Sequence, residues 1–521
     1  MSLHTLSARA LQAELSTGQL SSEELVGALN ARTAAVDPTI RAFVHRFDEA
    51  ALTEARRLDE ERRQGKVRGP LHGIPLSVKE NIATAGQPQT LGIRSRLGTL
   101  APEDAVVVKV LREAGAIVMG KTNVPLLLLS FETHNEIYGT THNPWQLDRV
   151  PGGSSGGEAA AIASGQVPLG IGTDIGGSIR IPAAFCGLPG LKTTVGRWSV
   201  WGSGTGIPGQ EIIRAVMGPM ARTVDDLTLL MQVVSGEAQR RFDAQIPPVA
   251  PPDPAAVSLR GLRVGVFEDD GVINPVASVR RAVAQAAQVL REAGATVVPF
   301  VPPSGAELVD LYFSALSSDG ARTIFGGMGD QGPTPQLKTL AQLAQMPSPL
   351  RAIVAAVMRA RGETRVSRQI EAFGEKRVAE LWALTARRTA LQRAELRAWE
   401  AAGIDVLIGP PSVTPAALHN ETHDFSLGAW PTMRWNLLDF AAGVVPTGRV
   451  RPAEAEVSPS GDRLDRKAAL FAQGSAGLPT GAQIIAAPWR EDRVLAVMGA
   501  IESALSGDPE YPTTPIDPPR R

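Results

Sequence analysis

Residues 151–192 read PGGSSGGEAAAIASGQVPLGIGTDIGGSIRIPAAFCGLPGLK and place a glycine- and serine-rich loop on either side of a helix of small residues. Glycine has no Cβ atom, so loops of this kind allow several backbone N–H groups to converge on one point. Phosphate-binding loops use such groups, but they also require Gly-Lys-Ser/Thr at the start of a helix, and neither loop contains that lysine. Convergent N–H groups also form oxyanion holes beside serine nucleophiles. The stretch therefore favours a serine-dependent enzyme.

A serine nucleophile needs a base that removes its proton, and the chain has seven histidines. The segment 153–157 (GSSGG) matches the G-x-S-x-G elbow of α/β-hydrolases, with His419 and His423 downstream as that fold requires. That elbow follows a strand, whereas residues 147–151 (LDRVP) have no strand pattern. A lysine base is the remaining alternative, and it is the interpretation that we favour.

Strand and helix patterns alternate along the chain on both sides of this stretch. Residues 72–78 (HGIPLSV) form a short β-rich run, and a helical pattern at 105–114 precedes a second β-rich run at 116–119. Residues 261–300 have the pattern of a β-α-β unit. This alternation predicts an α/β fold with a large mixed, mostly parallel twisted sheet covered by helices on both faces. We expect the whole chain, 1–521, to form a single domain.

The composition excludes several functional classes. With 52 Lys and Arg against 53 Asp and Glu and only 5% aromatic residues, the chain lacks the basic surface and the stacking platforms of nucleic-acid-binding proteins. Its single cysteine, Cys186, cannot form an internal disulfide, and zinc sites with two or four cysteines are excluded. No signal-like N-terminus and no apolar window of about 18 residues is found. The sequence predicts a cytoplasmic protein with no metal and no nucleic-acid partner.

Several motifs resemble the amidase signature family in their order and spacing: GIPLSVKEN with Lys79, GKTNVP from Gly120, NPW at Asn143, the loops PGGSSGG and GTDIGGSIR, and GPMARTVDDL from Gly218. The block of two loops is the most specific of them. The resemblance covers about Leu6 to the helix after Trp489, with a core signature at 72–232. It implies the amidase signature fold and a hydrolase that cleaves amide bonds without a cofactor.

The resemblance also implies a catalytic relay of Lys79, Ser154 and Ser178, with a cis peptide before Ser154. A free lysine titrates near pKa ~10.4, so a lysine base must be buried, and the apolar strand before Lys79 provides that burial. The neutral amine would take a proton from Ser154, which takes one from Ser178, whose Oγ attacks the amide carbonyl. Backbone N–H groups of the second loop would stabilise the oxyanion: Ile175, Gly176, Gly177 and Ser178. Four neighbours are expected to support the loops or to orient Lys79: Ser155, Thr173, Asp174 and Arg180.

Within the family the chain is most similar to fatty acid amide hydrolases. That similarity rests on SSDGARTIF from Ser317, WNLLDFAAGVVP from Trp435 and Pro488-Trp489, although no counterpart of the N-terminal membrane helix of the animal enzymes is found. In those enzymes a helical hairpin caps an apolar channel and touches the membrane. The matching stretch is a cap-like helical insertion at about 336–365. We expect it to cover a substrate channel that also includes Leu128 and Trp489.

The insertion carries five apolar residues at helical spacing: Leu350, Ile353, Val354, Val357 and Met358. No aromatic residue occurs at 326–372, so the interfacial anchors of a membrane-bound cap are missing. An ordinary buried helix explains the pattern equally well. We therefore expect at most peripheral contact with a membrane, and among oligomeric states a homodimer is favoured.

Three functions remain open. The favoured one is hydrolysis of apolar or fatty acyl amides through an acyl-enzyme, with carbamates and esters as further substrates of the same chemistry. The second is an amidotransferase-type subunit that releases ammonia from glutamine for a partner. The family's amidotransferase subunits have an acidic phrase after GKTN, whereas residues 124–129 here are apolar (VPLLLL). The third is hydrolysis of short-chain or aryl amides.

Overall fold

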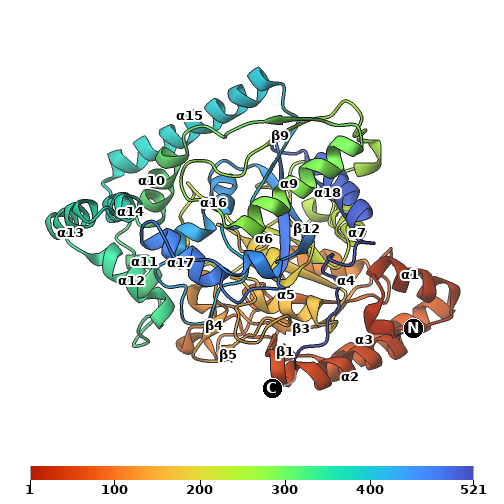
Figure 1. Ribbon diagram of the computed structural model, residues 1–521. Coiled ribbons are helices and arrows are strands. Elements are labelled where there is room, and N and C mark those ends of the chain that lie inside the picture. Colours follow the sequence, from red (N-terminus) through yellow and green to blue (C-terminus); the bar gives the residue numbers. More distant parts are fainter. Residues whose placement is uncertain (1, 520–521) are drawn as a thin grey trace.

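The computed structural model describes residues 2–519, which are built around one 11-stranded sheet (Figure 1). The strands of this sheet are β1 (Phe43–Arg46), β2 (Pro75–Lys79), β3 (Ile117–Thr122), β6 (Leu169–Asp174), β7 (Gly190–Lys192), β8 (Val216–Ala221), β9 (Arg263–Val266), β10 (Thr296–Pro299), β11 (Val406–Gly409), β12 (Ala441–Arg449) and β13 (Pro479–Ala486). A separate two-stranded ribbon consists of β4 (His134–Asn135) and β5 (Gly139–Thr140).

The α-helices lie between and after these strands. They are α1 (Ala8–Thr17), α2 (Ser22–Ile40), α3 (Asp48–Arg63), α4 (Val106–Glu113), α5 (Gly156–Ala163), α6 (Arg180–Cys186), α7 (Val224–Val233), α8 (Gly236–Arg240), α9 (Ala277–Glu292), α10 (Gly305–Leu316), α11 (Arg322–Gly326), α12 (Pro335–Gln345), α13 (Ser348–Ala360), α14 (Thr364–Ala372), α15 (Val378–Ala402), α16 (Trp430–Leu437), α17 (Arg463–Ala472) and α18 (Glu491–Leu505).

The strand order is β1-β3-β2-β6-β8-β7-β12-β13-β11-β9-β10. Neighbours in β3-β2-β6 and in β11-β9-β10 run parallel, and α4 and α9 connect the parallel pairs β2–β3 and β9–β10. The pairings between these two groups, and the pairing of β1 with β3, are antiparallel. The predicted large mixed sheet is confirmed. Parallel pairing is confined to the two groups. Parallel neighbours need crossover connections, such as those through α4 and α9, whereas the central strands pair antiparallel.

Helices cover both faces of the sheet, as the buried residues of β11 show. Val406 and Ile408 belong to one hydrophobic cluster, which includes residues of α9 and α18, whereas Leu407 belongs to a second cluster with residues of α10, α15 and α16. Successive strand residues point to opposite faces, so the two clusters lie on opposite sides of the sheet. In Figure 1 the helices α11–α14 gather at one end of the molecule, far from α1–α3.

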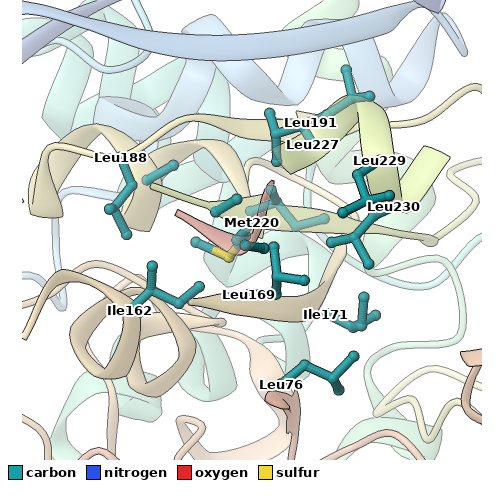
Figure 2. Packing of buried hydrophobic residues seen from close by; sticks show 14 of the residues in the cluster. Leu76, Ile162, Leu169, Ile171, Leu188, Leu191, Met220, Leu227, Leu229 and Leu230 are labelled. Carbon is teal, nitrogen blue, oxygen red and sulfur yellow. The ribbon is translucent and has the colours of Figure 1, made fainter. Parts of the chain in front are cut away.

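Close hydrophobic packing fixes the strands next to the two glycine-rich loops (Figure 2). Leu169 and Ile171 of β6 pack in one cluster with Leu76 of β2 and Met220 of β8. Ile162 of α5 belongs to the same cluster. Truncating such a side chain to alanine typically costs about 2–5 kcal/mol of stability. The packing therefore holds in place the end of β6 and the start of α5, from which the two loops extend.

Two glycines of β6 allow α5 to approach the sheet closely. A Cβ atom at Gly170 would lie 1.8 Å from Glu158 Oε1 of α5, and one at Gly172 would lie 2.9 Å from Ser155 Oγ. Both distances are shorter than real Cβ contacts, so a side chain at either position would displace Glu158 or Ser155 from β6. The N-terminal end of α5, with Ser154 and Ser155 just before it, therefore lies directly against β6.

The predicted insertion at 336–365 corresponds to α12, α13 and the start of α14. The break between α12 and α13 falls at Met346 and Pro347, where proline cannot continue the hydrogen-bond pattern of the preceding helix. Helix α14 continues to Ala372, so the helical region is longer than predicted. Within residues 2–519, no helix is both long and apolar enough to cross a membrane.

Candidate active site

The end of β2 and the two glycine-rich loops bring the predicted relay residues together. Lys79 is the last residue of β2, and its Nζ donates hydrogen bonds to Ser154 Oγ at 2.7 Å and to Thr173 Oγ1 at 2.8 Å. The Gly153–Ser154 peptide is cis. Ser178 lies in the second loop and lines the same small cavity as Ser154 and Thr173. A basic amine and two serine hydroxyls are thus gathered at one place.

Burial determines the protonation of Lys79. The side chain has no exposed surface, and desolvation lowers the pKa of its amine to about 7. The negative charges of Asp174, Glu158 and Glu80 act in the opposite direction and cancel only part of this effect. An amine with this pKa is substantially neutral at pH 7, so it can accept a proton from a neighbouring hydroxyl.

Ser155 connects the two loops. Its backbone N–H donates to the carbonyl of Ser178 at 3.1 Å. Its Oγ lies 3.4 Å from the backbone nitrogen of Thr173, which donates to it. Ser155 therefore links the first loop to both the end of β6 and the second loop.

Glu158 is a buried carboxyl that ties α5 to two strands of the sheet. Its oxygens accept hydrogen bonds from Ser77 Oγ of β2 and from Thr122 Oγ1 of β3. Burial raises the pKa of Glu158 to about 7, although both hydroxyl groups act in the opposite direction. Its role was not predicted from the sequence, because a glutamate early in a helix usually lies at the surface.

A buried ion pair fixes the second loop. Arg180 Nε and Nη2 donate to Asp174 Oδ2 and Oδ1 at 3.1 and 3.0 Å, and neither side chain is exposed. Burial alone would raise the pKa of Asp174, but the charge and hydrogen bonds of Arg180 hold it well below its ordinary value. The same carboxylate accepts the backbone N–H groups of Gly177 at 2.8 Å and of Ile179 at 3.1 Å.

This geometry corrects one member of the predicted oxyanion hole. The N–H of Gly177 is bonded to Asp174, because a buried carboxylate must be satisfied by donors that include the backbone around it. Gly177 is therefore not a free donor in this structure. Ile175, Gly176 and Ser178 line the larger cavity described below, and their N–H groups remain the candidate donors.

Asn436 of α16 and Gln483 of β13 complete the surroundings of the ion pair. Arg180 Nη1 donates to Gln483 Oε1 at 2.7 Å, and Asn436 Nδ2 donates to Asp174 Oδ1 at 2.9 Å. Neither residue was predicted from the sequence. They lie 303 positions from Arg180 and 262 positions from Asp174, and no local motif marks either of them.

A cavity of about 290 Å³ is lined by Ser178 and by mostly apolar side chains. Its walls come from the loop after β3, from α10 and from α12–α14, and they include Leu128, Leu129, Phe313, Leu337, Leu340, Leu343, Val354, Met358, Val366, Ile370 and Phe373. Polar side chains also line it, among them His423, Asp424 and Arg463. Leu128 thus lines the cavity that holds Ser178, and its contact with substrate remains a prediction.

Trp489 does not line this cavity. Its backbone N–H donates to Thr194 Oγ1 at 2.8 Å, and its ring lies 5.4 Å from the guanidinium carbon of Arg197. The residue lies just before α18, which packs against β12, and its ring stacks on Arg197 instead of lining the cavity. The expectation that Trp489 contributes to the substrate channel is therefore corrected.

The apolar residues of α13 divide between two sides of the helix. Val354 and Met358 line the cavity, whereas Leu350, Ile353 and Val357 are 49%, 61% and 45% exposed. The sequence alone could not separate them, because the five residues form one broad stripe at helical spacing. Only two of the five predicted cap residues therefore contact the cavity.

His419 and Cys186, which were also named from the sequence, make other contacts. His419 lies beside Glu132, with Nδ1 3.6 Å from Oε1, and its ring packs edge-on against His142. Cys186 is buried, which raises the pKa of its thiol, and its Sγ lies 3.4 Å from the carbonyl oxygen of Pro151. Among residues 2–519, no group of three or more His, Cys, Asp or Glu side chains is placed to hold a metal ion.

Comparisons with known proteins place this chain in a family. The model of the Amidase family matches residues 24–495. Fatty-acid amide hydrolase 1 of Sus scrofa is 34% identical over 85% of this chain and 77% of its own length. A glutamyl-tRNA(Gln) amidotransferase subunit of Chloroflexus aggregans is 44% identical, over 62% of this chain and 65% of its own length.

The structure agrees with this assignment. A solved structure of a fatty acid amide hydrolase superimposes with a TM-score of 0.84 at 27% identity, covering 97% of this chain and 86% of that one. The family model and the pig relative both extend over most of the chain, and the family match includes the two glycine-rich loops. The chain therefore belongs to the amidase signature family and is an amide hydrolase.

Proposed function

We propose that the chain hydrolyses amides through an acyl-enzyme, with Ser178 as the nucleophile, Ser154 as the proton relay and Lys79 as the base. The observation that carries the proposal is the 2.7 Å hydrogen bond between the fully buried Lys79 amine and Ser154, next to a cavity shared with Ser178. A proton passes from Ser178 to Ser154 and from Ser154 to Lys79 while the Ser178 Oγ attacks the carbonyl. The reverse transfer protonates the leaving amine, and water then hydrolyses the ester.

The N–H groups of Ile175, Gly176 and Ser178 stabilise the oxyanion in this proposal. Losing one such donor typically costs about 10²–10³ in kcat. Asp174 and Arg180 do not contact the substrate. They hold the second loop in the shape that presents these donors.

Apolar or fatty acyl amides are the proposed substrates, with carbamates and esters as further substrates of the same chemistry. The cavity beside Ser178 is lined mainly by leucine, valine, isoleucine and phenylalanine side chains, which would take up an acyl chain by burying its methylene groups. The similarity to fatty-acid amide hydrolase 1 over 85% of the chain supports this choice. A short-chain or aryl amide would leave most of this apolar lining without contact to the substrate.

The second candidate is a subunit that releases ammonia from glutamine for a partner. It is supported by the 44% identity to the glutamyl-tRNA(Gln) amidotransferase subunit of Chloroflexus aggregans, which covers 62% of this chain. A protein of that kind acts on a polar amide. The apolar cavity beside Ser178 disfavours it, since glutamine has no long chain to place there.

We also propose that any contact with a membrane is peripheral and is made by α13. Leu350, Ile353 and Val357 are exposed on one side of this helix. An exposed apolar face of this kind is typical of helices that lie on a membrane surface.

The test uses the purified chain alone with anilides from acetyl to palmitoyl and with glutamine. We expect a fluorophosphonate probe to label Ser178, as located by mass spectrometry, and Ser178→Ala to abolish both labelling and turnover. Ser16→Ala, at an exposed serine of α1, is the matched control and should keep both labelling and turnover. Labelling at another residue, or full turnover by Ser178→Ala, would overturn the mechanism. Glutamine as the best substrate would favour the second candidate.

A further inference from the structure

Two hydroxyl groups from distant helices hold the backbone of the second glycine-rich loop. Tyr312 Oη of α10 donates a hydrogen bond to the carbonyl of Ile175 at 3.1 Å, and Thr432 Oγ1 of α16 lies 2.9 Å from the carbonyl of Gly176. Thr432 has one hydroxyl proton and also lies 2.7 Å from the carbonyl of Ala429, so its proton is shared between two acceptors. Tyr312 therefore provides the better defined of the two bonds.

A peptide unit is planar and trans, so its C=O and N–H point in opposite directions. The carbonyl of Ile175 and the N–H of Gly176 belong to one such unit. A hydrogen bond that fixes the Ile175 carbonyl toward Tyr312 consequently fixes the Gly176 N–H away from Tyr312. Gly176 lines the cavity together with Ser178, where the oxyanion must form, and Tyr312 lines the same cavity.

The loop leaves room for this hydroxyl only because residue 176 is glycine. A Cβ atom at this position would lie 2.6 Å from Tyr312 Oη, which is closer than real Cβ contacts allow. Tyr312 itself is 3% exposed, and its ring packs edge-on against that of Phe313 with ring centroids 5.6 Å apart. The hydroxyl is therefore held at the loop by a side chain that is packed in the core.

We propose that Tyr312 is a positioning residue for amide hydrolysis, whose hydroxyl orients the Gly176 N–H toward the oxyanion. The inference rests on the proposed function, because it needs an oxyanion beside Ser178. The Gly177 N–H is already bonded to Asp174, so fewer backbone N–H groups remain for the oxyanion. The orientation of the Gly176 N–H therefore matters more, and a group that fixes it is needed.

The first test is Tyr312→Phe, which keeps the ring and removes only the hydroxyl. Losing a whole oxyanion donor costs about 10²–10³ in kcat, so we expect loosening one donor to lower kcat about tenfold and to leave KM unchanged. The affinity for a trifluoromethyl ketone, which forms a tetrahedral adduct with the serine, should fall by the same factor. Tyr138→Phe is the matched control, because the Tyr138 hydroxyl lies 3.0 Å from His45 Nε2 and outside the cavity.

A second measurement separates this role from a loss of folded protein. The rate ratio between an oxygen ester and its thiono analogue is measured on one sample, so the fraction of active enzyme cancels. Sulfur is a poor hydrogen-bond acceptor, so a weakened oxyanion hole should lower this ratio in Tyr312→Phe. An unchanged ratio together with wild-type kcat would overturn the proposal.

A double-mutant cycle with Gly176→Ala tests the contact itself. The added Cβ should displace the Tyr312 hydroxyl in the wild type, whereas Tyr312→Phe has no hydroxyl to displace. Gly176→Ala should therefore lower kcat more in the wild type than in Tyr312→Phe, and equal losses would contradict the proposal. Failure of the proposed function would be recognised separately, because the wild type would then neither cleave amides nor be labelled at Ser178.

Discussion

Lys79 shows how burial can turn a single lysine residue into a base. Its amine is fully buried among neutral oxygen acceptors, and desolvation brings its pKa to about 7. Asp174, whose charge opposes this shift most strongly, is paired with Arg180, so it does not form an ion pair with Lys79. The amine can therefore lose its proton near neutral pH without a histidine.

This environment predicts the pH dependence of the enzyme. The protonated amine cannot accept a proton, so kcat/KM should rise about tenfold per pH unit well below the pKa of about 7 and level off above it. Lys79→Ala should lower kcat by several orders of magnitude at every pH, whereas Lys66→Ala, at an exposed lysine, should have no effect. Initial rates from pH 5 to 9 test this expectation, and a flat profile with chemistry limiting would contradict it.

Among the helices and strands around the site, those set by local sequence could be predicted. The loop glycines and the strand before Lys79 carry patterns that are visible within a few residues. The bonds of Asn436, Gln483 and Tyr312 could not be predicted, because they join α16, β13 and α10 to a loop far away in the chain. The hydrogen bond from the Gly177 N–H to the Asp174 carboxylate could not be predicted either, because the sequence does not show which backbone N–H groups donate to a carboxylate.

The Asp174–Arg180 pair between β6 and α6 should contribute strongly to stability. Arg180→Met leaves the Asp174 carboxylate buried without its cation, which typically costs about 3–5 kcal/mol. Arg322→Met is a matched control, because its pair with Glu375 is exposed and should contribute at most about 1 kcal/mol. The free energies of unfolding come from chemical denaturation. Equal losses in the two variants would show that the buried pair is not what holds this loop.

In the molecule as a whole, two parts of the chain meet at the cavity. The relay and the second loop come from β2, β6 and the loops before α5 and after β6, whereas the apolar walls come largely from α10 and α12–α14. Figure 1 shows α12–α14 together at one end of the molecule. The two β-α-β units could be predicted from their local alternation of strand and helix. The antiparallel centre that joins them could not, because strand order depends on pairing between distant segments.

This arrangement predicts how activity depends on acyl chain length. Each methylene group buried in the cavity contributes at most about 0.8 kcal/mol, or about a fourfold gain in kcat/KM, until the cavity is filled. Truncating Val354 and Met358 together to alanine should flatten this dependence and spare short amides, because both side chains line the cavity. Leu350→Ala with Ile353→Ala on the exposed side of the same helix is the matched control and should keep the full slope. If the Val354 and Met358 double variant instead slows acetamide and palmitoyl amides equally, α13 supports the fold without selecting the acyl chain. The proposal of a fatty amide substrate would then fail, while the serine–lysine amidase would stand.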